Sequence, residues 1–387
     1  MSKLQKQRNY GIDLIRLIAM LMVVLLHTLK FYFGLLDKSA PLGERWWLAW
    51  SLETLCYCAV NCYALVSGFV SCKSSRFHFN RPMEAWLQGL LYSVGITVLF
   101  VIFTDYRVNT YQMIQRTLVV TTGRYWYLTA YIILAFFTPF CNKLIGSITK
   151  KQHRLLLLLS FFFFSLLSLL PFGYSGVFAT SGGYTFVWLL ILYFAGAYLR
   201  LYPEDFKRSK WVYLLGYFLS AAFTVISIAA QKYIPQTDFG KTAVAQIWSK
   251  YMSPYFLLSY QSPTIIFCAV FLVLFFSRLN IRSKVPVKLI GFFAPAAFGV
   301  YLIHMTPPIE SLMTDLCMSY AAGAEPLLLF VSILLSAAAV FAVCLCIDRI
   351  RIALFNLIHI PQLCVWIDEK MRKLLNYLWR NREPEKE

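Results

Sequence analysis

The sequence predicts an all-α polytopic membrane protein with about ten transmembrane helices. Of its 387 residues, 59% are hydrophobic, 17% are aromatic and only 14% are charged, whereas about a quarter of a typical soluble domain is charged. Apolar runs long enough to cross a bilayer core of about 30 Å recur along the chain. The composition therefore excludes a soluble domain with a large core.

Ten apolar runs mark the expected helices. They span residues 11–34, 48–70, 83–103, 126–146, 154–170, 184–200, 211–230, 255–277, 289–306 and 326–347. Pro254 precedes the eighth run and Pro263 lies within it, and because proline interrupts a helix, this run can be a re-entrant piece. The first run is too long for the apolar region of a signal peptide and lacks a small-residue cleavage site, so we expect an uncleaved first span.

Lysine and arginine are distributed unevenly between the loops. The N-terminus, every second loop and the C-terminal tail hold 26 of the 36 Lys and Arg residues, and the intervening loops hold eight. Because positively charged loops stay on the cytoplasmic side, this alternation predicts ten spans with both termini cytoplasmic. The net charge of +18 follows from this topology. We therefore expect contact with membrane lipid and none with nucleic acid.

The chain divides into a transmembrane part, residues 1–350, and a tail, residues 351–387. The tail mixes tryptophan and leucine with lysine and arginine, which is typical of an amphipathic helix on the cytoplasmic leaflet. A final helix packed on the bundle explains the pattern equally well. The ten cysteines lie mostly in apolar segments and lack the spacing of metal ligands, so we expect no metal site.

The first apolar run carries Asp13, Arg16 and His27, in addition to Lys30 near its end. Each such group costs roughly 2.5 kcal/mol or more at membrane depth unless it is paired or hydrated. Arg16 and His27 are eleven residues apart, which places them about 20° apart around the helix and about 16 Å apart along its axis. An arginine near the inner end and a histidine near the outer end of one face predict a polar track through the membrane.

Two further residues are expected at the depth of His27. His304 lies in the ninth run, which also runs outward, and Glu53 lies near the outer end of the second run. A neutral imidazole can accept a proton from a hydroxyl group, and a carboxylate or a second histidine can orient it. The alternative is that each histidine bonds a neighbouring helix and only contributes to packing.

Arg16 has two possible roles. It can extend to the interface or pair with Asp13 three residues earlier, or it can hold an anionic group that enters from the cytoplasm. The basic loop with Lys73, Arg76 and Arg81 could grip phosphates, although topology alone also predicts lysine and arginine there.

The outer loops contain an aromatic-rich segment that includes Arg124 and Trp126. Such segments usually form the interfacial aromatic belt of a membrane protein. Stacking on a sugar ring is the less common alternative. The sequence contains no phosphate-cradling glycine loop and no serine-elbow motif.

Four short blocks follow a common pattern. The first consists of Arg8, Asp13, Leu14, Arg16, Ala19, Val23 and His27; the others are Ser67-Gly68-Phe69, Trp126-Tyr127-Leu128 with Tyr131 and Pro139, and the stretch Phe298-Gly299-Val300-Tyr301-Leu302-Ile303-His304. In this combination the chain resembles the membrane-bound acyltransferase-3 family over residues 8–304.

The resemblance implies transfer of an acyl group, usually acetyl from acetyl-coenzyme A, to an extracytoplasmic glycan or lipid-linked saccharide. It implies that His27 is the catalytic base or acyl carrier, and that Arg16 is its essential partner on the coenzyme side. Supporting or acceptor-positioning roles then fall to Asp13, Glu53, His304, Tyr301, Arg124 and Trp126, and coenzyme binding to Arg16, Lys73, Arg76 and Arg81. The expected location is the cytoplasmic membrane of a bacterium.

A transporter of a small polar molecule such as an amino acid is the alternative function. A relative of this family forms the membrane half of serine/alanine racemases, where transport is proposed. The absence of clear helix breaks in paired halves of the chain argues against a transporter. Direct transfer and an acyl-enzyme intermediate both fit the sequence, as do acetyl and other acyl groups.

Overall fold

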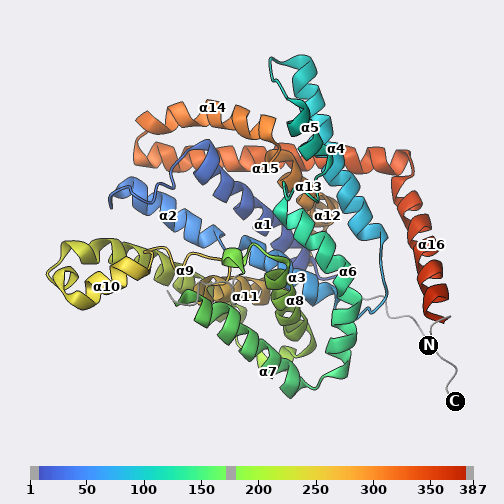
Figure 1. Cartoon of the computed structure of the whole chain (residues 1–387), viewed down its shortest axis with the longest axis horizontal. Helices are drawn as coiled ribbons and strands as arrows, with labels where there is room; N and C mark the ends of the chain where they lie inside the picture. Colours follow the sequence, from blue (N-terminus) through green and yellow to red (C-terminus); the bar gives the residue numbers. More distant parts are fainter. Residues whose placement is uncertain (1–7, 171–179, 381–387) are drawn as a thin grey trace.

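The computed structural model describes residues 8–170 and 180–380, and within these residues it contains helices and no strands. The α-helices are α1 (Tyr10–His27), α2 (Glu44–Cys56), α3 (Ala59–Ser71), α4 (Asn80–Phe103), α5 (Thr110–Thr117), α6 (Trp126–Ser147), α7 (Lys150–Phe161), α8 (Phe186–Leu201), α9 (Lys210–Tyr233), α10 (Ala243–Tyr251), α11 (Pro263–Ser277), α12 (Lys284–Phe293), α13 (Ala297–His304), α14 (Pro307–Gly323), α15 (Pro326–Leu357) and α16 (Ile360–Arg380). Figure 1 shows their arrangement.

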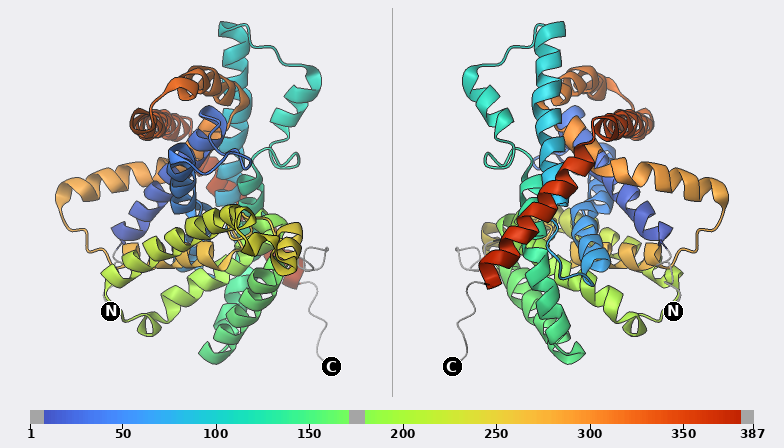
Figure 2. Two further views of the ribbon diagram at one scale, coloured as in Figure 1. Left: turned by 90° about the vertical axis from the view of Figure 1, so that its left-hand side faces the viewer. Right: turned by 90° about the vertical axis from the view of Figure 1, so that its right-hand side faces the viewer.

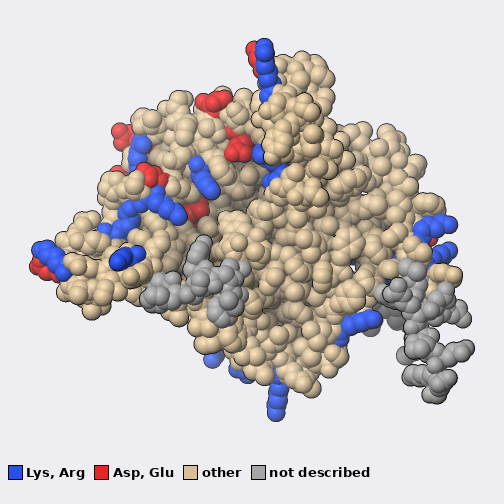
Figure 3. All heavy atoms as spheres, viewed as in Figure 1, with Lys and Arg blue, Asp and Glu red and all other residues tan. Residues whose placement is uncertain are grey.

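The helices confirm an integral membrane protein of the all-α polytopic class. In the described part of the chain, eight helical segments are long and apolar enough to cross a membrane, and α8 and α11 are shorter apolar helices. Each of the ten expected runs overlaps one of these segments. On the face seen in Figure 3, charged side chains gather in the upper left and at the edges, and a broad uncharged area covers the centre and right.

Helix α1 lies in the middle of the bundle and contacts α2, α3, α11, α12, α13 and α15 (Figures 1 and 2). Its apolar residues are mostly buried in the main hydrophobic core, where Ile15 and Val24 are fully inaccessible. A polar side chain on α1 therefore faces other helices and not lipid. The surrounding helices form the walls around Arg16 and His27.

Helices α3 and α8 approach one another so closely that glycine is required on both. A Cβ atom at Gly68 would collide with the carbonyl oxygen of Tyr193, and one at Gly196 would collide with the carbonyl oxygen of Leu65. Only glycine leaves the backbone free of this clash. Gly68 follows Ser67, and the close packing fixes the position of Ser67 near the C-terminal end of α3.

Several predicted helix boundaries were wrong. The run 48–70 is two helices, since α2 ends at Cys56 and α3 begins at Ala59. The run 255–277 is helical only from Pro263, because proline has no N–H group and is favoured at the first position of a helix. Residues 255–262, the first part of this predicted run, form turns and bends instead. Helix α15 continues to Leu357, and α14 was not predicted.

The tail folds as the predicted helix, α16, and it packs against α4. The Asp368 carboxylate accepts a hydrogen bond of 2.7 Å from the backbone N–H of Phe79, and it forms an ion pair with Arg372. This contact ties the tail to the basic loop between α3 and α4. This packing agrees with a final helix packed on the bundle, while the exposed apolar side chains of α16, such as Trp366 and Leu374, agree with an amphipathic helix on the leaflet.

Candidate active site

One helix positions both Arg16 and His27. Helix α1 is unbroken from Tyr10 to His27, so the two residues lie about 16 Å apart along its axis. The Asn9 side chain caps its first turn by accepting hydrogen bonds from the backbone N–H groups of Gly11 and Ile12. After His27 the chain continues as a π-helical turn, Thr28–Tyr32. Such turns occur frequently at functional sites.

His27 and His304 form a direct pair. Nδ1 of His27 lies 2.8 Å from Nε2 of His304, and their ring centroids are 5.1 Å apart. Nδ1 of His304 lies 2.6 Å from the carbonyl oxygen of Val300. His304 is fully buried, whereas His27 is half-buried.

The hydrogen bonds define which nitrogen of each neutral imidazole carries the proton. The Val300 carbonyl can only accept, so Nδ1 of His304 is the donor and its Nε2 is an acceptor. Nδ1 of His27 must then donate to that Nε2. The remaining Nε2 of His27 has a lone pair, and no described residue forms a hydrogen bond with it. This arrangement is that of a base oriented by a second group.

Arg16 is held by a carboxylate at the other end of α1. The Asp13 carboxylate accepts hydrogen bonds from Arg16, at 2.9 Å, and from Arg8, at 2.5 Å. The Tyr63 hydroxyl donates to the backbone oxygen of Arg16 at 2.7 Å. Since one carboxylate faces two guanidinium groups, and the Arg16 side chain remains 32% exposed, the site retains positive charge.

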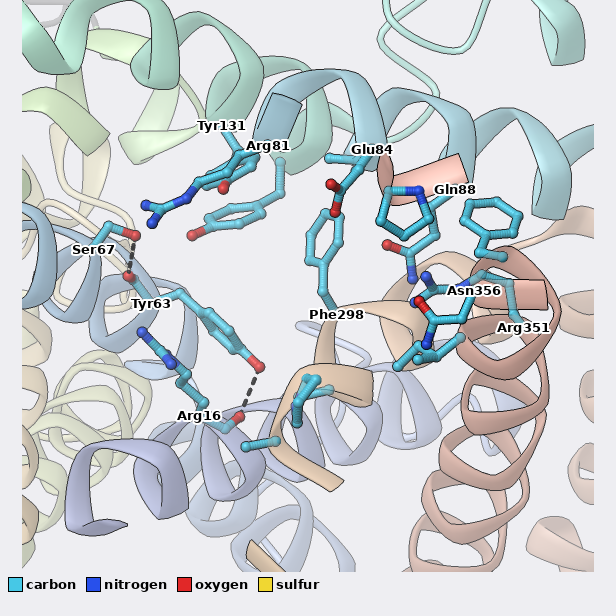
Figure 4. Close-up of a pocket in the computed structure, with 18 residues that line it drawn as sticks. Arg16, Tyr63, Ser67, Arg81, Glu84, Gln88, Tyr131, Phe298, Arg351 and Asn356 are labelled. Carbon is cyan, nitrogen blue, oxygen red and sulfur yellow. Dashed lines mark hydrogen bonds between the residues drawn. The ribbon is translucent and has the colours of Figure 1, made fainter. Parts of the chain in front are cut away.

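Two neighbouring cavities meet at Arg16. Their volumes are about 470 and 540 Å³, and both are lined by Arg16, Ser67, Arg81 and Tyr131. Figure 4 shows Arg16 and Arg81 on one side of the first cavity and Arg351 on the other. The second cavity is also lined by Lys73, Arg76 and His78. The structure thus brings together the four residues expected to bind coenzyme.

The positive charge of the second cavity comes from arginine and lysine. His78 also lines it, but burial and the neighbouring charge of Arg81 lower the pKa of His78. The imidazole is therefore mainly neutral at pH 7. Multiple guanidinium groups around one space are suited to phosphate groups, which they bind through paired hydrogen bonds.

A third cavity, of about 40 Å³, is lined by His27. Its walls include Tyr63 and Tyr127, and these two tyrosines also line the 470 Å³ cavity that contains Arg16. Their ring centroids are 6.0 Å apart, and the ring planes are inclined by 66° in an edge-to-face arrangement. The two side chains therefore separate the arginine cavity from the histidine cavity. A volume of this size accommodates about three water-sized atoms.

Only some of the other expected site residues lie at the cavity of His27. Tyr301 and Trp126 line the cavity of His27. Arg124 is exposed and does not line this cavity. Glu53 is buried, with 7% of its surface exposed, but no hydrogen bond joins it to either histidine among the described residues. In the part of the chain that the structure describes, the two imidazoles bond to each other, and neither forms a hydrogen bond with a carboxylate.

Sequence reasoning missed Tyr63, Tyr127 and Arg351 as cavity residues. Tyr63 is four residues before Ser67 and on the same face of α3, so the spacing could have indicated it. Arg351 lies on α15 beyond the end of the predicted tenth helix, and its position depends on Asp348, which accepts two hydrogen bonds from it. In the described residues, no group of three or more His, Cys, Asp or Glu side chains could hold a metal ion.

Comparison with known proteins identifies the family. The sequence model of an acyltransferase domain, that of the acyltransferase-3 family, matches residues 9–349. The chain belongs to this family. No curated protein and no solved structure matches the chain. Membership makes this acyltransferase-3 protein an acyltransferase, and the matched residues include both ends of α1 and the whole of α13.

Proposed function

We propose that this acyltransferase-3 protein transfers an acetyl group from cytoplasmic acetyl-coenzyme A to a hydroxyl group of an extracytoplasmic glycan or lipid-linked saccharide. The proposed location is the bacterial cytoplasmic membrane, with both termini inside. The observation that carries the proposal is the shared wall of Tyr63 and Tyr127 between the cavities of Arg16 and His27. The positively charged cavity of Arg16, which suits an anion, lies on one side of this wall, and the cavity of the proposed base His27 lies on the other side.

The coenzyme phosphates bind in the arginine cavities in this proposal. Arg16 and Arg81 line both cavities, and Lys73 and Arg76 add charge to the second. Charge-assisted hydrogen bonds to phosphate are stronger than neutral ones. The extended pantetheine arm then carries the thioester past Tyr63 and Tyr127, over the distance of about 16 Å set by helix α1.

His27 acts as the general base in the transfer step. Its Nε2 takes the proton of the acceptor hydroxyl, whose oxygen attacks the thioester carbonyl carbon. The carbon–sulfur bond breaks, and the leaving thiolate of coenzyme A takes the proton back from the imidazolium. His304 keeps Nδ1 of His27 protonated and the ring oriented. The alternative course, in which Nε2 carries the acetyl group transiently, uses the same lone pair.

Acetyl transfer by purified protein tests the proposal. The protein in nanodiscs is supplied with radiolabelled acetyl-coenzyme A and a glycan that offers free hydroxyl groups, and release of coenzyme A thiol is followed for wild type, His27→Ala and Arg16→Ala. We expect turnover in wild type, loss of turnover without loss of coenzyme binding in His27→Ala, and weaker coenzyme binding by tenfold or more in Arg16→Ala, which corresponds to about 1.4 kcal/mol.

Arg282→Ala is the matched control for charge, because Arg282 is exposed on the α11–α12 loop and lines none of the three cavities. It should bind coenzyme as wild type does. If wild type neither binds nor cleaves acetyl-coenzyme A, the proposal is wrong and flux assays for a small polar solute become the next measurement.

A further inference from the structure

A further cavity, of about 270 Å³, lies where helix α16 packs beside the basic loop and the C-terminal end of α6. We name it the tail cavity. Its walls come from three separate segments of the chain and include Arg76 and Phe77 from the basic loop, Lys143 from α6, and Arg372 and Leu375 from α16. The reaction proposed above makes no use of Lys143 or Arg372.

The tail cavity is positively charged. Three cations line it, and none of the described residues in its walls is acidic. Arg372 forms an ion pair with Asp368, but its side chain remains 36% exposed. Arg76 and Lys143 are exposed and form no ion pair in the part of the chain that the structure describes. Positive charge therefore remains at the cavity even when Asp368 is counted.

The loop segment that lines the tail cavity is held at both ends. The Asn142 side chain on α6 donates a hydrogen bond of 2.6 Å to the carbonyl oxygen of Ser74. The Asp368 carboxylate on α16 accepts one of 2.7 Å from the backbone N–H of Phe79. The residues that line the cavity lie between these two attachment points. The three walls are thus fixed relative to one another before a ligand binds, which lowers the cost of binding.

An exposed apolar side of α6 ends at the tail cavity. Phe136, Phe140 and Leu144 are exposed, and their spacing places them on one side of this helix. Lys143 follows Phe136 by seven residues, about two turns, and so lies on nearly the same side. The Phe77 ring packs edge-to-face on Phe140, with centroids 5.4 Å apart. Because α6 is long and apolar enough to cross a membrane, this side meets acyl chains and the cations at its end meet lipid headgroups.

We propose that the tail cavity binds the phosphate group of an anionic phospholipid, whose acyl chains lie along the exposed side of α6. Arginine and lysine donate charge-assisted hydrogen bonds to phosphate oxygens, and basic pockets beside membrane helices are suited to acidic headgroups. Phosphatidylcholine has the same phosphate but also a quaternary ammonium group, which the three cations repel. The site therefore favours a headgroup with net negative charge.

Coenzyme A is the other source of phosphate near this cavity. Arg76 also lines the 540 Å³ cavity, whereas Lys143 and Arg372 line neither of the two arginine cavities. Coenzyme A has no long acyl chains to cover the exposed phenylalanine side chains of α6. The apolar side of α6 next to the cations thus favours the lipid.

Lipid retention tests the proposal. The full-length protein is incorporated into nanodiscs with equal amounts of phosphatidylglycerol and phosphatidylcholine, and the bound lipids are counted by native mass spectrometry. We expect wild type to retain phosphatidylglycerol over phosphatidylcholine by tenfold or more. Lys143→Gln should lower this preference at least threefold, and Arg76→Gln, on a different segment, should lower it in the same way.

Lys151→Gln is the matched control, because Lys151 is an exposed lysine at the start of α7 that lines none of these cavities. It should retain lipid as wild type does. An equal loss in Lys151→Gln would assign the preference to general surface charge and overturn the site, as would unchanged retention in Lys143→Gln.

Two soluble competitors distinguish the lipid from other phosphates. Neither sn-glycerol 3-phosphate nor coenzyme A should displace phosphatidylglycerol when added at the concentration of the lipid. Displacement by glycerol phosphate would show a site for phosphate without acyl chains, and displacement by coenzyme A would assign the cavity to the coenzyme. Either result overturns the lipid site, and neither depends on whether the protein cleaves acetyl-coenzyme A.

Discussion

Nδ1 of His27 and Nε2 of His304 lie 2.8 Å apart, and the Val300 carbonyl at 2.6 Å from Nδ1 of His304 sets the direction of both hydrogen bonds. We therefore expect His27→Ala to lower kcat by roughly 10²–10⁴-fold, the usual contribution of a general base. His304→Ala should lower kcat less, because the base remains but its ring is no longer oriented. The measurement is steady-state release of coenzyme A.

The conservative variant His304→Gln tests orientation. Its amide oxygen can accept from Nδ1 of His27, so kcat should recover part of the loss seen in His304→Ala. His153→Gln is the matched control, because His153 is another buried histidine that bonds a backbone carbonyl, that of Phe194, away from the cavities. Normal kcat in His304→Ala would show that the pair only packs.

A second prediction concerns Asp348, a fully buried carboxylate on α15. It accepts hydrogen bonds from Gln88 at 2.8 Å, from Tyr92 at 2.7 Å and from Arg351 at 2.7 Å. Asp348→Ala leaves the Arg351 charge unpaired, which typically costs about 3–5 kcal/mol for a buried pair. We expect a clear fall in the thermal unfolding midpoint in detergent, together with weaker coenzyme binding, since Arg351 lines the 470 Å³ cavity.

Asp238→Ala controls for the loss of an aspartate ion pair. Asp238 pairs with Lys241, but its side chain is 97% exposed, and exposed pairs contribute little. Its unfolding midpoint should match wild type. An unchanged midpoint in Asp348→Ala would mean that the network around Arg351 is not important for stability.

The sequence predicted the membrane fold and the positions of Arg16 and His27, because both depend on strong local signals. Apolar runs determine the spans, and Arg16 and His27 lie on one helix whose geometry is regular. The pairing of His27 with His304 could not be predicted, since it depends on how α13 packs on α1. The same holds for Tyr127, whose apolar surroundings resemble those of any core tyrosine, whereas the spacing of Tyr63 from Ser67 on α3 was a usable signal.

Hydrogen bonds and an ion pair explain two helix boundaries that the sequence did not predict. Helix α11 begins only at Pro263, and in the turns before it Tyr260 bonds Asn61 and Gly182. These partners are distant in sequence and became visible only in the fold. Helix α15 continues past the predicted end because the Asp348–Arg351 ion pair removes the cost of placing these charges within a long helix.

A third prediction concerns the contact of α3 with α8. Gly68→Ala would place a Cβ against the carbonyl oxygen of Tyr193, and because this neighbour is backbone it cannot move aside. Overpacking of this kind costs about 1–3 kcal/mol. We expect a lower unfolding midpoint and weaker coenzyme binding, since Ser67 lines both arginine cavities.

Gly146→Ala is the matched control for this substitution. Gly146 lies within α6 and a Cβ there meets no atom within 4 Å. Alanine has the higher helix propensity, so this variant should be as stable as wild type or slightly more stable. Equal midpoints for the two alanine variants would contradict the packing argument.

The last prediction concerns pH and the loop after α8. Lys150 donates a hydrogen bond of 2.6 Å to Asp205, and the Tyr198 hydroxyl donates one of 2.5 Å. The hydrogen bond from Lys150, followed by that from Tyr198, lowers the pKa of Asp205 in the folded protein. A lowered carboxyl pKa stabilises the folded state above the unfolded pKa of about 3.9, and this contribution disappears as pH falls through the folded value.

Asp205→Asn should therefore have a slightly lower unfolding midpoint than wild type between pH 5 and 7 (about the range above the unfolded pKa). The difference should narrow below about pH 4, where the carboxyl group of the unfolded chain becomes protonated, and it should disappear once the pH falls below the lowered pKa of the folded protein, where Asp205 loses its ionic bond with Lys150. Asp315→Asn, on exposed α14 and without an ion pair among the described residues, should match wild type at each pH. A difference for Asp205→Asn that grows on acidification would reverse the sign and contradict the assigned hydrogen bonds.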